Sequence, residues 1–148
     1  MLRRLMLTGD DRVALLLRLV LGAVMFPHGA QKVLGWFGGY GFHGTMGFFT
    51  GQLHVPALFA VLAIVAEFAG SLALLAGLLT RVAAAGILAN MLVAIALVHA
   101  RIGFFMNWSG QQRGEGVEYH LLAIGIALAL IIRGGGAASV DRALSRKP

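Results

Sequence analysis

Apolar residues gather in four long runs along this chain, and polar residues lie mainly in the segments between them. The runs extend over about residues 13–31, 55–79, 82–99 and 117–132. A helix needs about 20 residues to cross the roughly 30 Å hydrocarbon core of a bilayer. The pattern therefore predicts an all-α protein with one domain, residues 1–148, built as an antiparallel bundle of four transmembrane helices. The fourth run is short for a span.

The connections between the runs add detail to this prediction. Only Thr80 and Arg81 separate the second and third runs, so these helices must be antiparallel neighbours. The segment 33–54 is rich in aromatic residues and glycine. Because aromatic rings concentrate at membrane–water boundaries, we expect this segment in the outer interface, as a re-entrant or short amphipathic piece. Rows of small residues four apart are typical of closely packed helices in lipid, and they occur at Ala69, Ala73 and Gly77 and at Gly125 and Ala129.

Composition supports the bilayer as the main partner. Hydrophobic residues make up 59% of the chain and charged residues 12%, and the mean hydropathy is +0.84. Soluble domains carry about 25% charged residues, so too little polar surface is available for a water-soluble fold. The absence of cysteine excludes disulfide exchange, iron–sulfur clusters and thiolate metal sites. The net charge of +6 comes from residues at the ends of apolar runs, a distribution that argues against nucleic acid as a partner.

The distribution of lysine and arginine predicts the orientation. Eight basic residues flank the runs on one side and three on the other. Because cytoplasmic loops carry the excess of basic residues, we expect a multi-pass protein of the bacterial inner membrane with both termini in the cytoplasm. Arg18 interrupts the first run, which also lacks a cleavage site, so this run is interpreted as an uncleaved span. The cytoplasmic set is Arg3, Arg4, Arg12, Arg81, Arg133, Arg142, Arg146 and Lys147, and the outer set is Lys32, Arg101 and Arg113.

Several polar side chains lie at bilayer depth, where an unpaired charge is costly and each ionisable group is a functional candidate. Arg18 and Glu67 lie at similar depth, which predicts a structural ion pair between the first two spans. Asn90 is expected to form an interhelical hydrogen bond. The candidate residues for binding a quinone or a proton-linked ligand are His28, Lys32, Glu67, His99, Arg101 and Glu118. They are expected to gather in the outer half of the bundle.

The candidate residues suggest a binding site more than a catalytic one. The chain shows no phosphate-binding glycine loop and no Ser/His/Asp arrangement. The histidines lack metal-ligand spacing, so no metal site is predicted and haem is disfavoured. Titratable groups beneath two aromatic loops indicate a docking site for a quinone headgroup or a proton-linked ligand. We expect an apolar pocket there, lined by His28, Glu67 and Glu118.

Short motifs around the spans resemble those of the DoxX family of small membrane proteins. Ser71 departs from the family pattern, in which a second glycine often follows the span-two glutamate. The motifs are His28-Gly29-x-x-Lys32, Glu67-x-x-Gly70, residues 77–81, His99 with residues 103–105, residues 116–119 and residues 134–141. The resemblance implies a four-helix fold and a role in membrane redox metabolism. Members resemble subunits of quinone-linked oxidoreductases that act on sulfur compounds, or partners of enzymes of oxidant defence.

Three hypotheses follow. The first is a quinone-interacting subunit of a redox system, linked to sulfur-compound oxidation or oxidant defence. Because the chain has no flavin, haem or cysteine motif, its electrons would come from a soluble or membrane oxidoreductase partner. The second is a non-catalytic membrane anchor or assembly subunit, and the third is a small-molecule or proton pathway. Whether the protein is itself an enzyme, and whether it forms a homo-oligomer, stay open.

Overall fold

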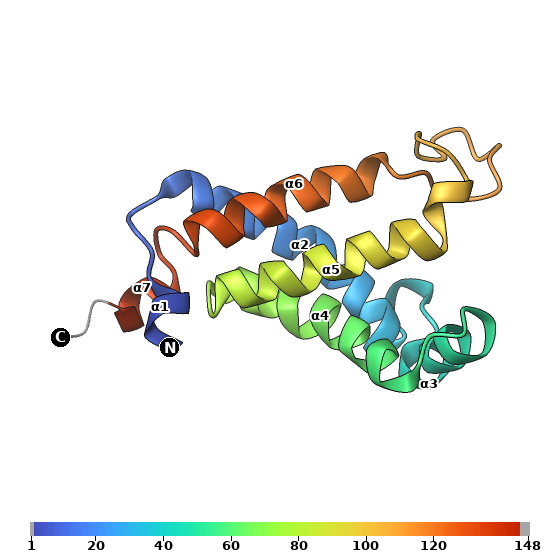
Figure 1. The fold of residues 1–148 in the computed structure, drawn as a ribbon, viewed down its shortest axis with the longest axis horizontal. Coiled ribbons are helices and arrows are strands. Elements are labelled where there is room, and N and C mark those ends of the chain that lie inside the picture. The colour runs from blue at the N-terminus through green and yellow to red at the C-terminus, as the bar shows by residue number, and fades with distance from the viewer. Residues whose placement is uncertain (1, 146–148) are drawn as a thin grey trace.

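The computed structural model describes residues 2–145, and it is all-α within that range. Four helices form the body of the protein (Figure 1): α2 (Arg12–Leu34), α4 (Ala57–Ala76), α5 (Thr80–Leu97) and α6 (Glu118–Arg133). Each begins and ends within three residues of one of the predicted runs. The all-α prediction is therefore confirmed, and the four helices coincide with the four predicted runs.

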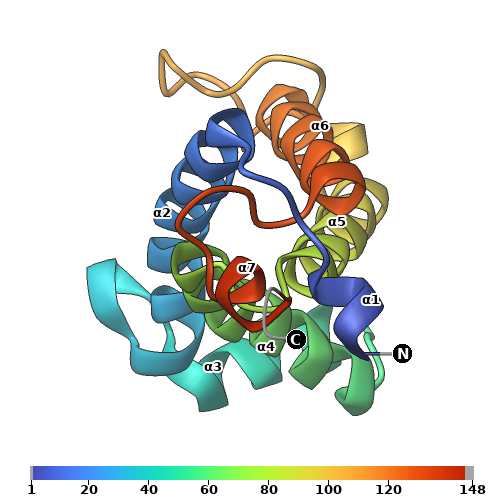
Figure 2. The same cartoon turned by 90° about the vertical axis from the view of Figure 1, so that its left-hand side faces the viewer.

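The four helices pack in chain order around a common core. α2 lies along α4, α4 along α5 and α5 along α6, and α6 also contacts α2. Figure 2 views the bundle end-on and shows this arrangement. Leu21, Met25, Leu74 and Ile87 are among the buried side chains at its centre. Leucine, valine and phenylalanine residues cover the outer faces, as expected of helices that face lipid.

Three of these helices, α2, α4 and α5, are long and apolar enough to cross a membrane. The chain is therefore a multi-pass membrane protein. Helix α6 has 16 residues and extends over about 24 Å at 1.5 Å per residue. This length is less than the roughly 30 Å of hydrocarbon that a span must cross, so the fourth crossing stays a prediction.

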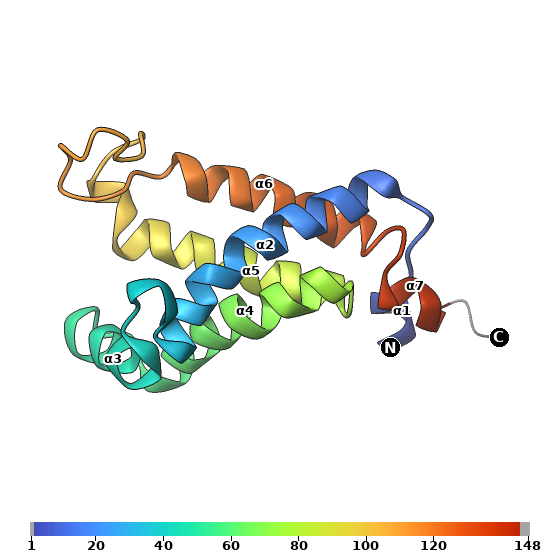
Figure 3. The same ribbon diagram turned by 180° about the vertical axis from the view of Figure 1, so that it is seen from behind.

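The bundle has two different ends, seen from behind in Figure 3. We call residues 35–56 and 98–117 the aromatic end. It contains α3 (Gly41–Gly47), the short turns η1 (Trp36–Gly38), η2 (Phe48–Gln52) and η3 (His99–Arg101), and the loop that precedes α6. We call residues 2–12, 77–81 and 133–145 the arginine end. There α1 (Leu2–Met6) packs against α7 (Val140–Ser145). Arg146 and Lys147, both in the predicted cytoplasmic set, lie outside the described residues.

Side-chain bonds to the main chain close the arginine end. The guanidinium group of Arg81 donates to Ile131 O at 2.6 Å, Ile132 O at 2.9 Å and Leu7 O at 2.9 Å. The carboxylate of Asp141 accepts from the backbone N–H groups of Leu79 at 2.6 Å and Thr80 at 2.8 Å. Most of these bonds pair backbone groups that α5 and α6 leave without an intrahelical partner at their ends. Together they hold the C-terminal segment against the bundle.

The closest helix contact is between α2 and α4. A Cβ atom on Gly29 would lie 2.5 Å from Phe68 Cα, so only glycine permits this approach. The sequence predicted close helix packing at two rows of small residues, and this prediction is wrong at two positions. Ala69 is exposed, and a Cβ atom on Gly125 would meet nothing within 4 Å. Helix α6 turns its Gly125 face outward, away from the bundle.

Candidate functional site

Three side chains from three helices meet in the half of the bundle nearer the aromatic end. Lys32 Nζ lies 2.5 Å from Glu67 Oε2, and Asn90 Nδ2 donates to Glu67 Oε1 at 2.7 Å. The Glu67 side chain is 7% exposed and that of Lys32 is 23% exposed. Both oxygens of a nearly buried carboxylate thus have a donor, which membrane burial requires. The predicted interhelical bond of Asn90 is confirmed.

The predicted ion pair between Arg18 and Glu67 is wrong. The Arg18 side chain is buried and donates to main-chain oxygens of α4 and the C-terminal segment instead. These acceptors are Leu74 O at 3.1 Å, Leu75 O at 2.7 Å, Gly135 O at 3.0 Å, Ala137 O at 3.4 Å and Ala138 O at 2.8 Å. Side chains lean toward the N-terminus of their own helix. Because α2 and α4 are antiparallel, Arg18 extends toward the arginine end and Glu67 toward the aromatic end.

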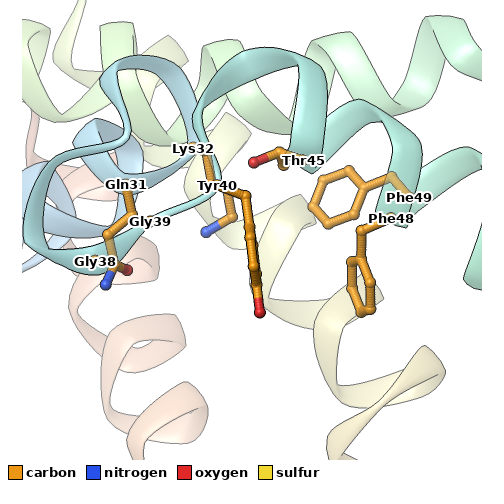
Figure 4. Close-up of a pocket in the computed structure, with 8 residues that line it drawn as sticks. All are labelled: Gln31, Lys32, Gly38, Gly39, Tyr40, Thr45, Phe48 and Phe49. Atoms are coloured by element: carbon orange, nitrogen blue, oxygen red, sulfur yellow. The ribbon is translucent and has the colours of Figure 1, made fainter.

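A cavity of about 250 Å³ lies beside Lys32 at the aromatic end. Figure 4 shows its lining: Gln31 and Lys32 from the end of α2, Gly38, Gly39 and Tyr40 from the connection, and Thr45, Phe48 and Phe49 from α3 and η2. Three aromatic rings and a lysine ammonium group therefore border one space. The connection lies tightly on α2, since a Cβ atom on Gly39 would fall 2.3 Å from Gln31 O.

Of the predicted site residues, Lys32 alone lines this cavity. Glu67 is the ion-pair partner of Lys32 and does not line the cavity, and neither do His28 and Glu118. The cavity beside Lys32 is therefore not the pocket predicted from His28, Glu67 and Glu118. Glu118 accepts a hydrogen bond from Trp108 Nε1 at 3.0 Å in the loop before α6. Arg101 is exposed at η3.

Tyr119 and His120 were missed by the sequence analysis. His120 is 6% exposed, and its ring centroid lies 4.1 Å from that of His99 and 5.5 Å from that of Tyr119. The Tyr119 ring in turn lies 5.9 Å from that of His28. The spacing of His120, Ala123, Ala127 and Leu130, all buried, follows one helix face. This spacing in the sequence could have identified His120 as a buried residue. The sequence analysis instead took the face of α6 that carries Gly125 to be the buried one.

No group of three or more histidine, aspartate or glutamate side chains among the described residues is arranged to hold a metal ion. The aromatic end therefore offers a lysine–carboxylate pair, an aromatic cavity and a row of rings. These groups can donate hydrogen bonds, stack on a flat ligand and exchange protons.

A model of the DoxX family matches residues 13–100, from the first turn of α2 to η3. The chain belongs to the DoxX family. The match includes Lys32, Glu67 and Asn90 and every residue that lines the cavity. It ends before α6, so the motif residues 103–105, 116–119 and 134–141 of this DoxX protein lie outside it. A search of curated proteins and a search of solved structures each found no match to the chain.

Proposed function

We propose that this DoxX protein is a membrane subunit of a redox system that binds a quinone headgroup beside Lys32. The observation that supports the proposal is a lysine ammonium group at the wall of an aromatic cavity, with its charge balanced by a nearly buried carboxylate. A quinone ring requires flat apolar walls and hydrogen-bond donors for its carbonyl oxygens. Phe48 and Phe49 offer such walls, and Lys32 and Gln31 offer donors.

The size of the cavity favours a headgroup over a whole lipid-like molecule. Its volume of about 250 Å³ lies just below the range of about 300–1,000 Å³ that is usual for small-molecule pockets. One substituted ring suits this space, and an apolar tail would extend into the surrounding lipid. The exposed rings of Tyr40 and Phe48 at its edge suit this arrangement.

The electrons for such a quinone would come from a partner protein. Reduction of a quinone to a quinol takes up two electrons and two protons, and this chain has no cysteine for an iron–sulfur or dithiol centre. Its own groups would bind the headgroup and exchange protons through Glu67. A link to sulfur-compound oxidation or oxidant defence is what the resemblance implies, and we keep it as part of the proposal.

We also propose four crossings with both termini in the cytoplasm of a bacterial cell. Six arginines of the predicted cytoplasmic set lie at the arginine end: Arg3, Arg4, Arg12, Arg81, Arg133 and Arg142. Because α1 and α7 pack together at that end, the chain between them must cross an even number of times. Helix α6 would then be the fourth span, in locally thinned lipid.

Binding of a tailless quinone analogue to the purified protein in detergent tests the proposed site. The protein as isolated should bind the analogue, and Phe49→Ala should weaken binding by about tenfold, because removing a large aromatic from a contact costs roughly 1–3 kcal/mol. Lys32→Met should weaken it by at least as much through the loss of a charged donor.

Phe42→Ala provides the matched control. Phe42 belongs to the same aromatic segment and is 40% exposed, but it does not line the cavity. The control should bind the analogue as the unaltered protein does. Absence of binding to the unaltered protein, or equal losses in Phe42→Ala and Phe49→Ala, would refute the quinone site and favour the anchor hypothesis.

A further inference from the structure

Four titratable side chains form a row across the bundle near the aromatic end. His99 belongs to η3, His120 and Tyr119 to α6, and His28 to α2. Successive ring centroids lie 4.1 Å, 5.5 Å and 5.9 Å apart. The row begins at the partly exposed His99, passes through the buried His120 and the partly buried Tyr119, and ends at His28, which is exposed.

The far end of the row lies near the Lys32–Glu67 pair. His28 precedes Lys32 by one helical turn, so both project from the same face of α2. Lys32 in turn forms the ion pair with Glu67. The row thus leads from the η3 turn to the helical turn of α2 that carries Lys32, the partner of Glu67.

The hydrogen bond of His99 sets its tautomer. Nδ1 of His99 lies 2.7 Å from Glu115 O. A carbonyl oxygen only accepts hydrogen bonds, so Nδ1 carries the proton and Nε2 of the neutral ring is the acceptor. His99 can therefore take up a proton at Nε2 and pass it on from the same atom, while Nδ1 keeps its proton in the hydrogen bond to the Glu115 carbonyl.

Two atoms of the row are buried without a partner. Nδ1 of His120 and the hydroxyl group of Tyr119 form no hydrogen bond within the protein. His120 as a whole is 6% exposed. A buried polar atom without a partner costs roughly 1–3 kcal/mol, and packing of α6 alone would not require a histidine and a tyrosine here. Such atoms in native proteins commonly bind ordered water.

We propose that His99, His120, Tyr119 and His28, bridged by water at the unpartnered atoms, form a route that carries protons from the aromatic end to Glu67. Each transfer moves one proton from a donor nitrogen or oxygen to the next acceptor. The net result is one proton taken up at His99 and one added to the Glu67 carboxylate, and no electrons move. The neutral carboxyl group then releases Lys32 toward the cavity.

The route rests on the proposed function only for its purpose, which is to supply protons for reduction of the quinone. Proton uptake by Glu67 itself does not require a bound quinone. The two proposals can therefore fail separately. The charged groups near the row are Lys32 and Glu67. The carboxylates of Glu115 and Glu118, on the segment next to the row, accept from Asn107 N–H and Trp108 Nε1 instead.

Time-resolved infrared spectroscopy after a light-triggered release of protons tests the route. The protein is placed in lipid nanodiscs without quinone, and the carbonyl stretch of protonated Glu67 is identified by its loss in Glu67→Gln. His120→Phe should slow protonation on the order of a hundredfold, the low end of what a positioned proton-transfer group contributes. His43→Phe, the same replacement on the exposed surface of α3, should leave the rate unchanged.

Tyr119→Phe is the second test, because it removes one hydroxyl group and keeps the ring. It should also slow protonation, while the equilibrium pH dependence of the Glu67 band stays that of the unaltered protein. A changed equilibrium curve with an unchanged rate would indicate a structural role and overturn the route. Normal rates in either folded variant would show that protons reach Glu67 through the cavity, and would overturn it too.

Discussion

At the scale of single residues, the direction in which a long side chain extends decides its partner. Lys32 and Arg18 lie on one helix, 14 positions apart, and both are cations at membrane depth. Lys32 reaches a carboxylate, whereas Arg18 reaches five main-chain oxygens. The planar guanidinium fork suits several carbonyl groups at once. Arg18 is therefore a structural clamp, and Lys32 is the one of the two that borders the cavity.

The Lys32–Glu67 pair gives a first prediction. Lys32→Met leaves the Glu67 carboxylate with Asn90 as its remaining donor among the described residues. It should lower the free energy of unfolding by about 2–3 kcal/mol, less than the roughly 3–5 kcal/mol of a fully buried pair, because Lys32 is 23% exposed. The double change Lys32→Met with Glu67→Leu should restore most of this loss. Thermal unfolding in detergent measures both, with Arg101→Met as an exposed control, and a double variant less stable than Lys32→Met would contradict the pairing.

Arg18 gives a second prediction. Arg18→Met removes the guanidinium donors to the carbonyl groups of Gly135, Ala137 and Ala138, and should loosen the C-terminal segment, although the Asp141 bonds remain. Hydrogen bonds to charged groups contribute about 1.5–3 kcal/mol each, so the unfolding temperature should fall clearly. Trypsin should cut faster after Arg142, as measured by mass spectrometry. Arg12→Met, at an exposed position of the same helix, should leave cleavage unchanged, and equal cleavage of both variants would refute the clamp.

At the scale of the elements, the helices are fixed by their contacts and by their caps. α2 shows both effects. Gly29 allows it to approach α4, and Asp11 caps its N-terminus by accepting from Val13 N at 2.9 Å and Ala14 N at 3.0 Å. A side-chain acceptor at this position satisfies backbone donors that the helix leaves unpaired.

The α2–α4 contact gives a third prediction. Gly29→Ala places a methyl group 2.5 Å from Phe68 Cα, and such overpacking typically costs about 1–3 kcal/mol. Gly125→Ala makes the same change in a helix where the methyl group meets nothing within 4 Å. It should stabilise α6 by up to about 1 kcal/mol, because alanine loses less backbone entropy than glycine. Thermal unfolding should thus move in opposite directions, and a shift of the same sign in both would contradict the packing.

The cap of α2 gives a fourth prediction, on pH. The backbone N–H of Ala14 and the side chain of Arg133 hold the pKa of Asp11 below its ordinary value of 3.8. A carboxylate with a lowered pKa in the folded state contributes stability above its unfolded pKa, and loses this contribution as pH falls through the folded value. Asp11→Asn keeps a capping oxygen but removes the charge. Compared with the unaltered protein, Asp11→Asn should therefore be least stable at neutral pH, and the difference should vanish as the pH falls below 3.8. The unfolding temperature of both proteins, measured against pH, tests this. A difference that is the same at every pH would argue against the charge effect.

At the scale of the whole molecule, the two ends differ in chemistry. Helices α1 and α7 lie at one end, and α3 and η3 lie at the other (Figure 1). The first end carries six arginines of the predicted cytoplasmic set, and the second carries the cavity with its aromatic rings. Basic residues favour the cytoplasmic side, and aromatic rings anchor at the interface. The proposed quinone site would therefore lie near the outer surface, where the tail of its ligand remains in lipid.

This polarity gives a fifth prediction. The chain has no cysteine, so single cysteines report topology directly. In intact cells, an impermeant thiol reagent should label Ser109→Cys in the loop before α6 and should spare Leu144→Cys until the membrane is opened. Both positions are exposed in the structure. Labelling of Leu144→Cys in intact cells would contradict the proposal, because it would mean either that the orientation is the opposite one or that the chain does not cross a fourth time.

The hydrophobic pattern by itself determined the helices and their approximate ends, because a long apolar run in lipid must satisfy its backbone internally. The same pattern indicated that Lys32, Glu67 and Asn90 matter, since polar groups at that depth need partners. Tertiary structure alone decided which partners they have. Depth along a span does not show where a long side chain extends, so Arg18 was assigned to the wrong acceptor. Gly125 and His120 likewise lie on opposite faces of α6, and only the packing of α6 against α5 and α2 showed which face is buried.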